Sequence, residues 1–341
     1  MSRAPSRLFP AHAPDQRPLT SAPDPRVPDR DRPAVFPTNP DASMVLIDGP
    51  WEHRFVAANG ARFHVAEQGQ GPLVLLLHGF PQFWWAWRHQ MQALADAGYR
   101  ACAIDLRGYG ASDKPPRGYD TRTSATDVAS VIRSLGESSA VVVGHGWGGW
   151  IAWSMASLQP AVTSALGSLS MPHPLVFRRA SFTNARQARA NGYLAGLQRP
   201  FVPEREMTMH GGYVQRLLRE WASPRGIWPS LEEARMYSDA MALPFVAHSA
   251  AEYYRWVVRS QVRPDGWRFA KRVSGPVGVP VLQVHGEDDP AVLPEIMPAS
   301  RGWCGGSYEE HQVPRAGHFL PEEAPEAVNG LLVGWLDRLH A

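Results

Sequence analysis

Residues 139–158 read SAVVVGHGWGGWIAWSMASL: a short run of branched apolar residues, a cluster of glycines, and an apolar segment of helical length. This order predicts a buried strand, a tight turn and a helix. It is the setting of a nucleophile elbow, a sharp strand-to-helix turn in which small residues flank the nucleophile. Gly144 and Gly148 match the flanking positions, so Gly146 stands where a Ser, Asp or Cys is expected.

The same glycines also fit the Gly-x-Gly-x-x-Gly pattern of dinucleotide-binding loops. That fingerprint requires an acidic residue about 20 positions later, which holds the ribose. After Gly149 the first acidic residue is Glu204, which lies beyond the next apolar strand, SALGSLS. The sequence therefore favours the elbow over a dinucleotide site, and it predicts no cofactor.

Similar apolar runs that lead into glycine-containing loops are PLVLLLHG at 72–79, YRACAIDLRG at 99–108 and VPVLQVHG at 279–286. Such runs are typical of strands buried on both faces of a parallel sheet. Segments with helical periodicity, around Val128 and at 328–339, lie between or after them. Alternating residues around Asn59-Gly60 predict an antiparallel hairpin at the start. We therefore predict an α/β fold with a mostly parallel, doubly wound sheet, whose functional loops meet at the carboxyl ends of the strands.

The remaining segments differ in composition. Residues 1–48 are rich in Pro, Arg and Asp and too poor in apolar residues to form a core, which predicts a disordered tail. Between 171 and 275 the strand signal gives way to Arg-rich and aromatic-rich helical stretches. We interpret this segment as a helical cap inserted between two strands of a core that consists of 49–170 and 276–341.

Charge and cysteine content exclude several classes of protein. With 34 basic and 32 acidic residues the formal net charge is +2, so no nucleic-acid-binding surface is predicted. Cys102 and Cys304 lack the spacing of a metal site or of a disulfide framework. The chain has no apolar run long enough to span a membrane, and its first residues do not resemble a signal peptide. These features predict a cytoplasmic protein and leave the oligomeric state open.

Two loops near the C-terminus complete a constellation in the chain order nucleophile, acid, histidine. The strand at 279–286 leads into Glu287-Asp288-Asp289-Pro290, and His318 lies in a later loop, AGHF. An acid can orient and charge-stabilise a histidine that acts as a general base. Alone, Asp289 could be a turn residue and His318 a structural one. Their order, at two strand ends, favours a catalytic pair.

Three motifs together resemble the epoxide hydrolases of the α/β-hydrolase fold: HGFPQFWWAWR at 78–88, DLRGYGASDKP at 105–115 and GHGWGG at 144–149. The resemblance extends from about Trp51 to the C-terminus, and related dehalogenases share much of it. It implies a hydrolase that acts on a small apolar epoxide or a related substrate. A dehalogenase would need the same missing Asp, and an ester hydrolase would need a Ser.

The resemblance also implies roles for individual residues. In this family an Asp at the elbow attacks an epoxide carbon, and a His–Asp pair then activates the water that hydrolyses the ester. The backbone N–H groups of Phe80 and Trp147 are implied to form the oxyanion hole, and Tyr254 to be one of two cap tyrosines that hydrogen-bond to the epoxide oxygen. The position of the second tyrosine aligns near Gly196, and Tyr193 reaches it only through a shifted helix. Packing within the cap is the alternative role for Tyr254.

Gly146 removes the attacking carboxylate, and neither His145 nor Trp147 is placed to replace it. Three interpretations remain. In the first, the chain is a hydrolase in which His318 activates a water for direct attack while Tyr254 polarises the leaving oxygen. In the second, it is a pseudoenzyme whose capped pocket binds a small molecule or a partner without turnover. In the third, Gly146 replaces the Asp of an ordinary epoxide hydrolase through a single-base change. The retained His–Asp pair favours the first of these.

Overall fold

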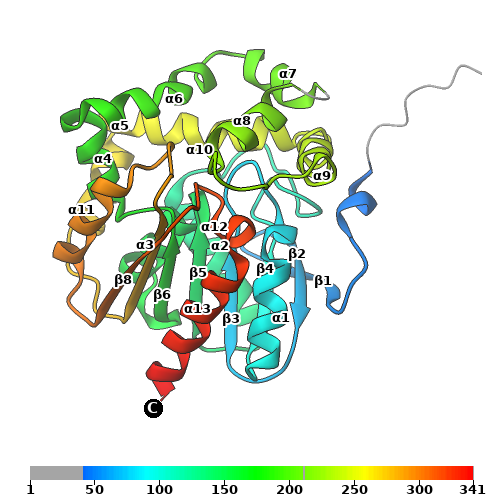
Figure 1. The fold of residues 1–341 in the computed structure, drawn as a ribbon, viewed down its shortest axis with the longest axis vertical. Helices are drawn as coiled ribbons and strands as arrows, with labels where there is room; N and C mark the ends of the chain where they lie inside the picture. The colour runs from blue at the N-terminus through cyan, green and yellow to red at the C-terminus, as the bar shows by residue number, and fades with distance from the viewer. Residues whose placement is uncertain (1–40, 210–211, 341) are drawn as a thin grey trace, which may run out of the picture. The chain divides into compact units, whose positions relative to one another are not determined.

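The computed structural model describes residues 41–209 and 212–340. Within these ranges, eight strands form one sheet in the order β1-β2-β4-β3-β5-β6-β7-β8 (Figure 1). The hairpin of β1 (Glu52–Ala58) and β2 (Ala61–Gln68) is antiparallel, and so is the pairing of β2 with β4 (Arg100–Ile104). All other neighbours are parallel, which confirms the predicted sheet.

The remaining strands are β3 (Leu73–Leu77), β5 (Ala140–His145), β6 (Thr163–Leu169), β7 (Val281–Gly286) and β8 (Tyr308–Val313). Each strand named by its apolar run is present. The strand β8, YEEHQV, was not predicted, because it is mostly half-buried and carries charged side chains. Among the described strands it lies at the edge of the sheet and pairs with β7.

Helices cover both faces of the sheet. On one face α1 (Arg88–Asp96) packs against α13 (Pro325–His340), and on the other α2 (Thr121–Ser134) packs against α3 (Trp147–Leu158) (Figure 1). The side chain of Asp120 caps α2 by accepting a hydrogen bond from the backbone N of Thr123. None of the helices in the described ranges combines the length and the hydropathy that crossing a bilayer requires.

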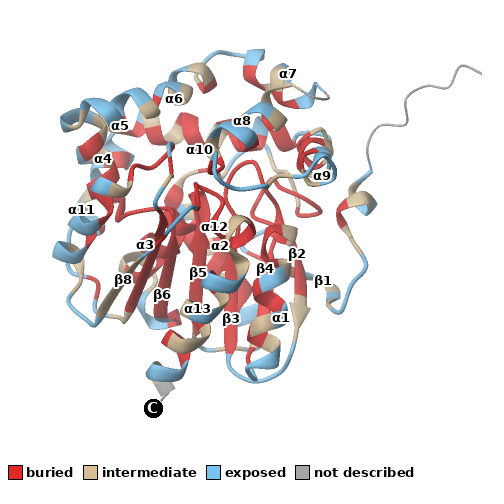
Figure 2. Cartoon of the chain, viewed as in Figure 1, coloured by how far each residue is buried: buried red, intermediate tan, exposed pale blue. Residues whose placement is uncertain are grey.

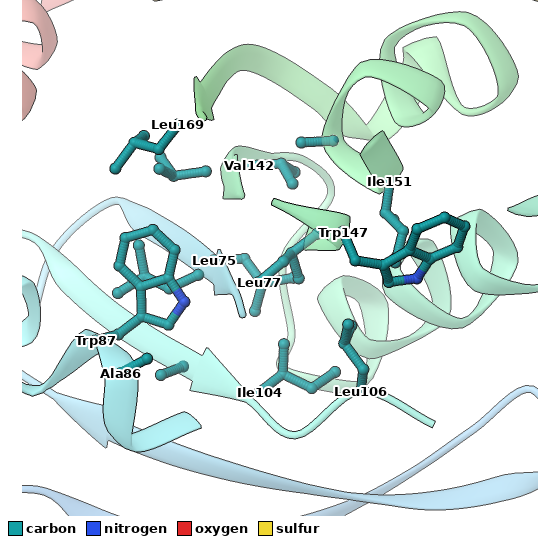
Figure 3. Close-up of a cluster of buried hydrophobic side chains, with 14 of the residues drawn as sticks. Leu75, Leu77, Ala86, Trp87, Ile104, Leu106, Val142, Trp147, Ile151 and Leu169 are labelled. Atoms are coloured by element: carbon teal, nitrogen blue, oxygen red, sulfur yellow. The ribbon is translucent and has the colours of Figure 1, made fainter. Parts of the chain in front are cut away.

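The sheet and its helices share one apolar core. The side chains of Leu75 and Leu77 on β3 are fully buried, and Figure 3 shows them in one cluster with Trp147 and Ile151 of α3. Figure 2 shows buried residues along the central strands and exposed ones on the outer turns of the helices. The core therefore gives the loops at the strand ends a rigid base.

A group of helices fills the stretch between β6 and β7, where the sequence predicts the cap, and most of them lie beyond one end of the sheet in Figure 1. These are α4 (Pro174–Thr183), α5 (Ala185–Ala190), α6 (Gly192–Leu197), α7 (Val202–Thr208), α8 (Tyr213–Trp221), α9 (Leu231–Met241), α10 (Val246–Arg259) and α11 (Pro264–Arg272). Shorter helical segments are η1 (Ala42–Val45), η2 (Trp84–Trp87), η3 (Pro160–Val162), η4 (Ser260–Val262), η5 (Pro294–Trp303) and α12 (Leu320–Glu323).

The described part of the predicted tail, residues 41–48, is ordered. Val45, in η1, is fully buried, and its carbonyl accepts a hydrogen bond from Nε1 of Trp84 at 2.7 Å. The carbonyl of Ile47 accepts another from Nε1 of Trp51, also at 2.7 Å. The prediction of disorder up to residue 48 is therefore wrong at its end, because a short apolar stretch packs beside two tryptophans. Residues 1–40 lie outside the described ranges.

Candidate active site

The turn between β5 and α3 is an elbow with Gly146 at its apex. Gly146 has φ 51° and ψ −115°, a backbone conformation that costs a residue with a side chain about 1–3 kcal/mol. Its backbone N donates to the carbonyl of Leu169, and its own carbonyl accepts from the N of Trp150. The turn is thus fixed between β6 and the first turn of α3, and glycine occupies it without strain.

The neighbouring glycines allow the elbow to pack closely. A Cβ on Gly144 would collide with the backbone of Gly148, and a Cβ on Gly148 would collide with the carbonyl of Leu77 at the end of β3. The repeated glycines therefore have a packing role within the turn.

His318 and Asp289 form a buried pair. Nδ1 of His318 lies 2.8 Å from Oδ2 of Asp289, and the two side chains are 5% and 0% exposed. The other oxygen of Asp289 accepts hydrogen bonds from the backbone N of Ala291 and of Val292, both at 2.9 Å. The carboxylate of Asp289 thus accepts hydrogen bonds from three donors. Nδ1 of a neutral His318 therefore carries the proton, and Nε2 is left as an acceptor.

Nε2 of His318 points into the space above Gly146. A Cβ built on Gly146 would lie 3.2 Å from this nitrogen and 3.8 Å from Cα of Gly79. In the described part of the chain, no hydrogen bond is formed by Nε2. The histidine and the nucleophile position thus face each other across a gap where no side chain stands.

The two amides expected to form the oxyanion hole lie on adjoining turns. Trp147 is the first residue of α3, so its N–H has no carbonyl partner within the helix. A Cβ on Gly79, the residue before Phe80, would lie 3.4 Å from the N of Trp147. Phe80 and Trp147 both line the cavity above Gly146.

The side chain of His145 contacts the backbone of the loop that carries His318. Its Nε2 lies 2.7 Å from the carbonyl of His318, and the hydroxyl of Ser170 donates to the same carbonyl at 2.7 Å. Burial, together with the charge of a protonated His318, lowers the pKa of His145 to about 3. His145 therefore stays neutral and donates from Nε2.

A small, partly open cavity lies above the elbow. Tyr254 of α10 and Tyr193 of α6 line it, with ring centroids 5.7 Å apart, and burial raises the pKa of both phenols. Both therefore remain hydroxyl donors. The other lining residues are Phe80, Gly146, Trp147, Trp150, Met171, Phe177, Leu194, Trp221, Val257, Ala291, Val292 and His318.

The structure thus brings Gly146, His318, Phe80, Trp147 and Tyr254 to one cavity, with Asp289 behind His318. It also brings Tyr193 there, although the sequence aligns Gly196 at that place. Among the described residues, no group of three or more His, Cys, Asp or Glu is placed to hold a metal ion.

Sequence reasoning missed Glu323, which holds the histidine loop. One of its carboxylate oxygens accepts from the backbone N of Gly317 (2.8 Å) and of Ser223 (2.7 Å), and the other accepts from the N of Phe319 (2.8 Å). The N of His318 itself donates to the carbonyl of Trp221 at 2.9 Å. The loop is thereby tied to the segment after α8. A Glu five residues after a histidine carries no sequence signal for such a role.

Comparisons with known proteins identify similar sequences and structures among the α/β hydrolases. A family model described as the alpha/beta hydrolase fold matches residues 72–325. AB hydrolase superfamily protein YfhM of Bacillus subtilis is 31% identical over 287 residues, which cover 83% of this chain and 97% of the relative. Epoxide hydrolase 3 of Xenopus tropicalis is 30% identical over 288 residues, 82% of this chain and 75% of the relative. The solved structure of an epoxide hydrolase from an endophytic Streptomyces has a TM-score of 0.70 and 32% sequence identity, and the match covers 86% of this chain and 97% of that structure's chain.

Proposed function

Because this chain belongs to the α/β-hydrolase family, and within it to the epoxide hydrolases, we propose that it hydrolyses a small apolar epoxide, or a related substrate, by direct attack of water. The covalent route through an elbow carboxylate is closed, since Gly146 has no side chain. The aromatic lining of the cavity suits an apolar substrate. The two cysteines of the chain, Cys102 and Cys304, are free thiols, which is consistent with a cytoplasmic location.

The observation that carries this proposal is the position of Nε2 of His318. This nitrogen has a lone pair, since Nδ1 donates to Asp289, and it faces the gap above Gly146 within the cavity. A water in that gap can donate to Nε2, and an amide N–H from Phe80 or Trp147 can position its oxygen. The arrangement is that of a general base with its orienting acid.

The reaction balances with these residues alone. The water oxygen bonds to an epoxide carbon while its proton passes to Nε2 of His318, and the carbon–oxygen bond of the ring breaks. Tyr254, beside Tyr193, hydrogen-bonds to the leaving oxygen and gives it a proton as the ring bond breaks, and Tyr254 then regains a proton from solvent, which balances the one that His318 releases. The Asp289 carboxylate stabilises the imidazolium until its proton returns to solvent. The product is a diol.

The first experiment measures turnover of aryl and alkyl epoxides by the unmodified protein and by the His318→Ala variant. General base catalysis contributes about 10²–10⁴-fold. We therefore expect kcat/KM to fall by about that factor in the variant while the thermal midpoint of unfolding changes little. Turnover that is equal in the two proteins would contradict the role of His318.

A second experiment separates the two routes by the origin of the oxygen. In a single turnover in H₂¹⁸O, direct attack places ¹⁸O in the diol of the unmodified protein. Gly146→Asp should restore a covalent route, in which the first diol takes its oxygen from the carboxylate and contains no ¹⁸O. This activity should be lost in Gly146→Asp combined with His318→Ala. An inert Gly146→Asp protein that folds normally would show that more than the carboxylate is missing.

Binding without turnover is the alternative function, and the empty elbow is the observation that favours it. A pseudoenzyme of this kind should show saturable protection against heat by an apolar ligand that it does not convert. Hydrolysis of that same ligand would exclude this alternative.

A further inference from the structure

We infer that the exposed side chains of α4 and of residues 259–272 form a surface that docks on a membrane containing anionic lipids. This surface is called the docking face below. The inference goes beyond the proposed function and does not rest on it, because it concerns where the protein is held and not what it converts.

Positive charge gathers in the part of the chain that contains α4–α11. Residues 171–275 include 16 Arg and Lys and 8 Asp and Glu, whereas the whole chain has 34 and 32. This segment therefore has a surplus of eight basic residues, and the rest of the chain has a surplus of acidic ones. A charge distribution of this kind orients a protein with its basic side toward an anionic surface.

On the docking face the positive charge is almost unopposed. Asp265 is the one acidic residue in α4 and in residues 259–272, and its side chain accepts a hydrogen bond from Nε1 of Trp256 at 3.0 Å. The exposed basic side chains form no ion pair with another described residue. They are Arg179, Arg259, Arg263, Arg268, Lys271 and Arg272.

Large apolar side chains project from the same face. Phe182 is 75% exposed, Val262 78% and Trp267 57%. The side chain of Gln261 lines a second cavity together with Phe182. The carbonyl of Gln261 accepts a hydrogen bond from Nε1 of Trp267 at 3.2 Å, and Val262 follows Gln261 in the chain. Exposed aromatic and aliphatic side chains among basic ones are typical of surfaces that enter the headgroup region of a bilayer.

The docking face lies beside the candidate site. Figure 1 shows α4 and α11 next to each other at one edge of the fold, and Phe177 of α4 and Phe269 of α11 both contact the ring of Trp150. The second cavity, of about 120 Å³, has a mostly apolar lining and shares Trp150 and Phe177 with the cavity above the elbow. Contact with an apolar phase stabilises such an apolar opening relative to contact with water.

The charges identify the partner. A second copy of this chain would bring like charges together at this face, and residues 1–40, with six Arg and four Asp, are basic as well. A bilayer with anionic lipids supplies negative charge for the Arg and Lys side chains. It also supplies an interface in which the rings of Phe182 and Trp267 leave water.

The test measures co-sedimentation of the full chain with lipid vesicles, without any epoxide. We expect the partition coefficient to be at least about tenfold higher for phosphatidylcholine–phosphatidylglycerol vesicles (about 7:3) than for phosphatidylcholine alone. About 0.5 M NaCl should remove most of this difference, because salt screens the attraction. Equal binding to the two kinds of vesicle, or binding to neither, overturns the inference. Binding to a DNA duplex without binding to anionic vesicles also overturns it.

Two double variants locate the docking face. Phe182→Ser with Val262→Ser removes apolar side chains and keeps the charge, and Arg268→Gln with Lys271→Gln removes two charges. Each pair should lower the partition coefficient for anionic vesicles about tenfold. All four side chains are exposed, so the thermal midpoint of unfolding should stay the same.

Matched controls change the same residue types elsewhere. Ile227, in the loop between α8 and α9, is fully exposed, and Arg54 and Arg62 are exposed on the β1-β2 hairpin. Ile227→Ser, and Arg54→Gln with Arg62→Gln, should bind anionic vesicles as the unmodified protein does. Losses in these controls that equal the losses in the docking-face variants overturn the inference.

The inference and the proposed function fail separately, because vesicle binding is measured without epoxide and epoxide turnover without vesicles. Hydrolysis without vesicle binding contradicts the inference alone. Vesicle binding without hydrolysis contradicts the proposed function alone.

Discussion

Gly148 has no room for a side chain. A Cβ at this position would collide with the carbonyl of Leu77, and a backbone carbonyl cannot rotate away as a flexible side chain could. We expect Gly148→Ala to destabilise the protein by about 1–3 kcal/mol, the usual cost of overpacking a core. Urea unfolding of the variant and of the unmodified protein measures this change.

Gly330→Ala is the matched control for that prediction. Gly330 is exposed within α13, and nothing lies within 4 Å of its Cβ position. Alanine is favoured over glycine in helices, so this variant should be as stable as the unmodified protein or slightly more stable. A Gly148→Ala variant that matches it would contradict the close packing of the elbow.

At the level of single residues, local sequence could predict part of the candidate site. Asp289, His318 and Gly146 each follow a strand, and the strands of a parallel sheet bring such loops to one edge. Tyr193 could not be assigned in this way. Its place at the cavity depends on how α6 packs against α10, which a motif alignment along one chain does not contain.

Among the elements, the loop between β8 and α12 depends on one carboxylate. Glu323 accepts from the backbone N of Gly317, Phe319 and Ser223. In Glu323→Gln one oxygen becomes an NH₂ group, which cannot accept, so at least one buried N–H loses its partner. We expect a loss of about 1–3 kcal/mol in the free energy of unfolding.

The same variant should also move the histidine, because two of these N–H groups flank His318 in the chain. Epoxide turnover, where it is measurable, should fall mainly in kcat, with little change in KM. Glu326→Gln changes an exposed carboxylate nearby and should alter neither stability nor kinetics. Equal stability of the two variants would contradict the role of Glu323.

Strands with a continuously apolar sequence were predictable, whereas the strand β8 and the segment at 42–47 were not. The strands β3, β5 and β7 are buried along their whole length, so their sequences are almost continuously apolar. The edge strand β8 lacks this signal because only its last residue is buried. The segment at 42–47 looked like part of the tail, and it is ordered through contacts with the nearby Trp51 and with Trp84, which lies farther along the chain.

For the whole molecule we predict a loss of stability in mild acid. Burial lowers the pKa of both His145 and His173 to about 3, from an ordinary value of 6.5. Between these values the unfolded chain binds protons that the folded chain does not bind. The free energy of unfolding therefore falls as the pH decreases from about 6.5, by at most about 1.4 kcal/mol per pH unit for each histidine.

Urea unfolding at pH 7.5, 6.0 and 5.0 measures this dependence. Nδ1 of His145 is buried and has no hydrogen-bond partner among the residues that the structure describes, so a second proton on this ring would have no acceptor. His173→Asn keeps a side chain that can cap the N-terminus of α4 and removes the titration, so the dependence on pH should become shallower. Stability that stays constant or rises between pH 6.5 and pH 5 would contradict the prediction.

The place of helices α4–α11 in the chain also determines when the candidate site is completed during folding. Leu166 of β6 pairs with Val281 of β7, so the segment that contains α4–α11 must be looped out before these strands meet. Contacts between such distant residues form slowly, because the loop must close before any contact is gained. Gly146 is synthesised long before Asp289 and His318. During synthesis on the ribosome, a nascent chain with a complete elbow therefore has neither its acid nor its base until the last part of the sequence emerges.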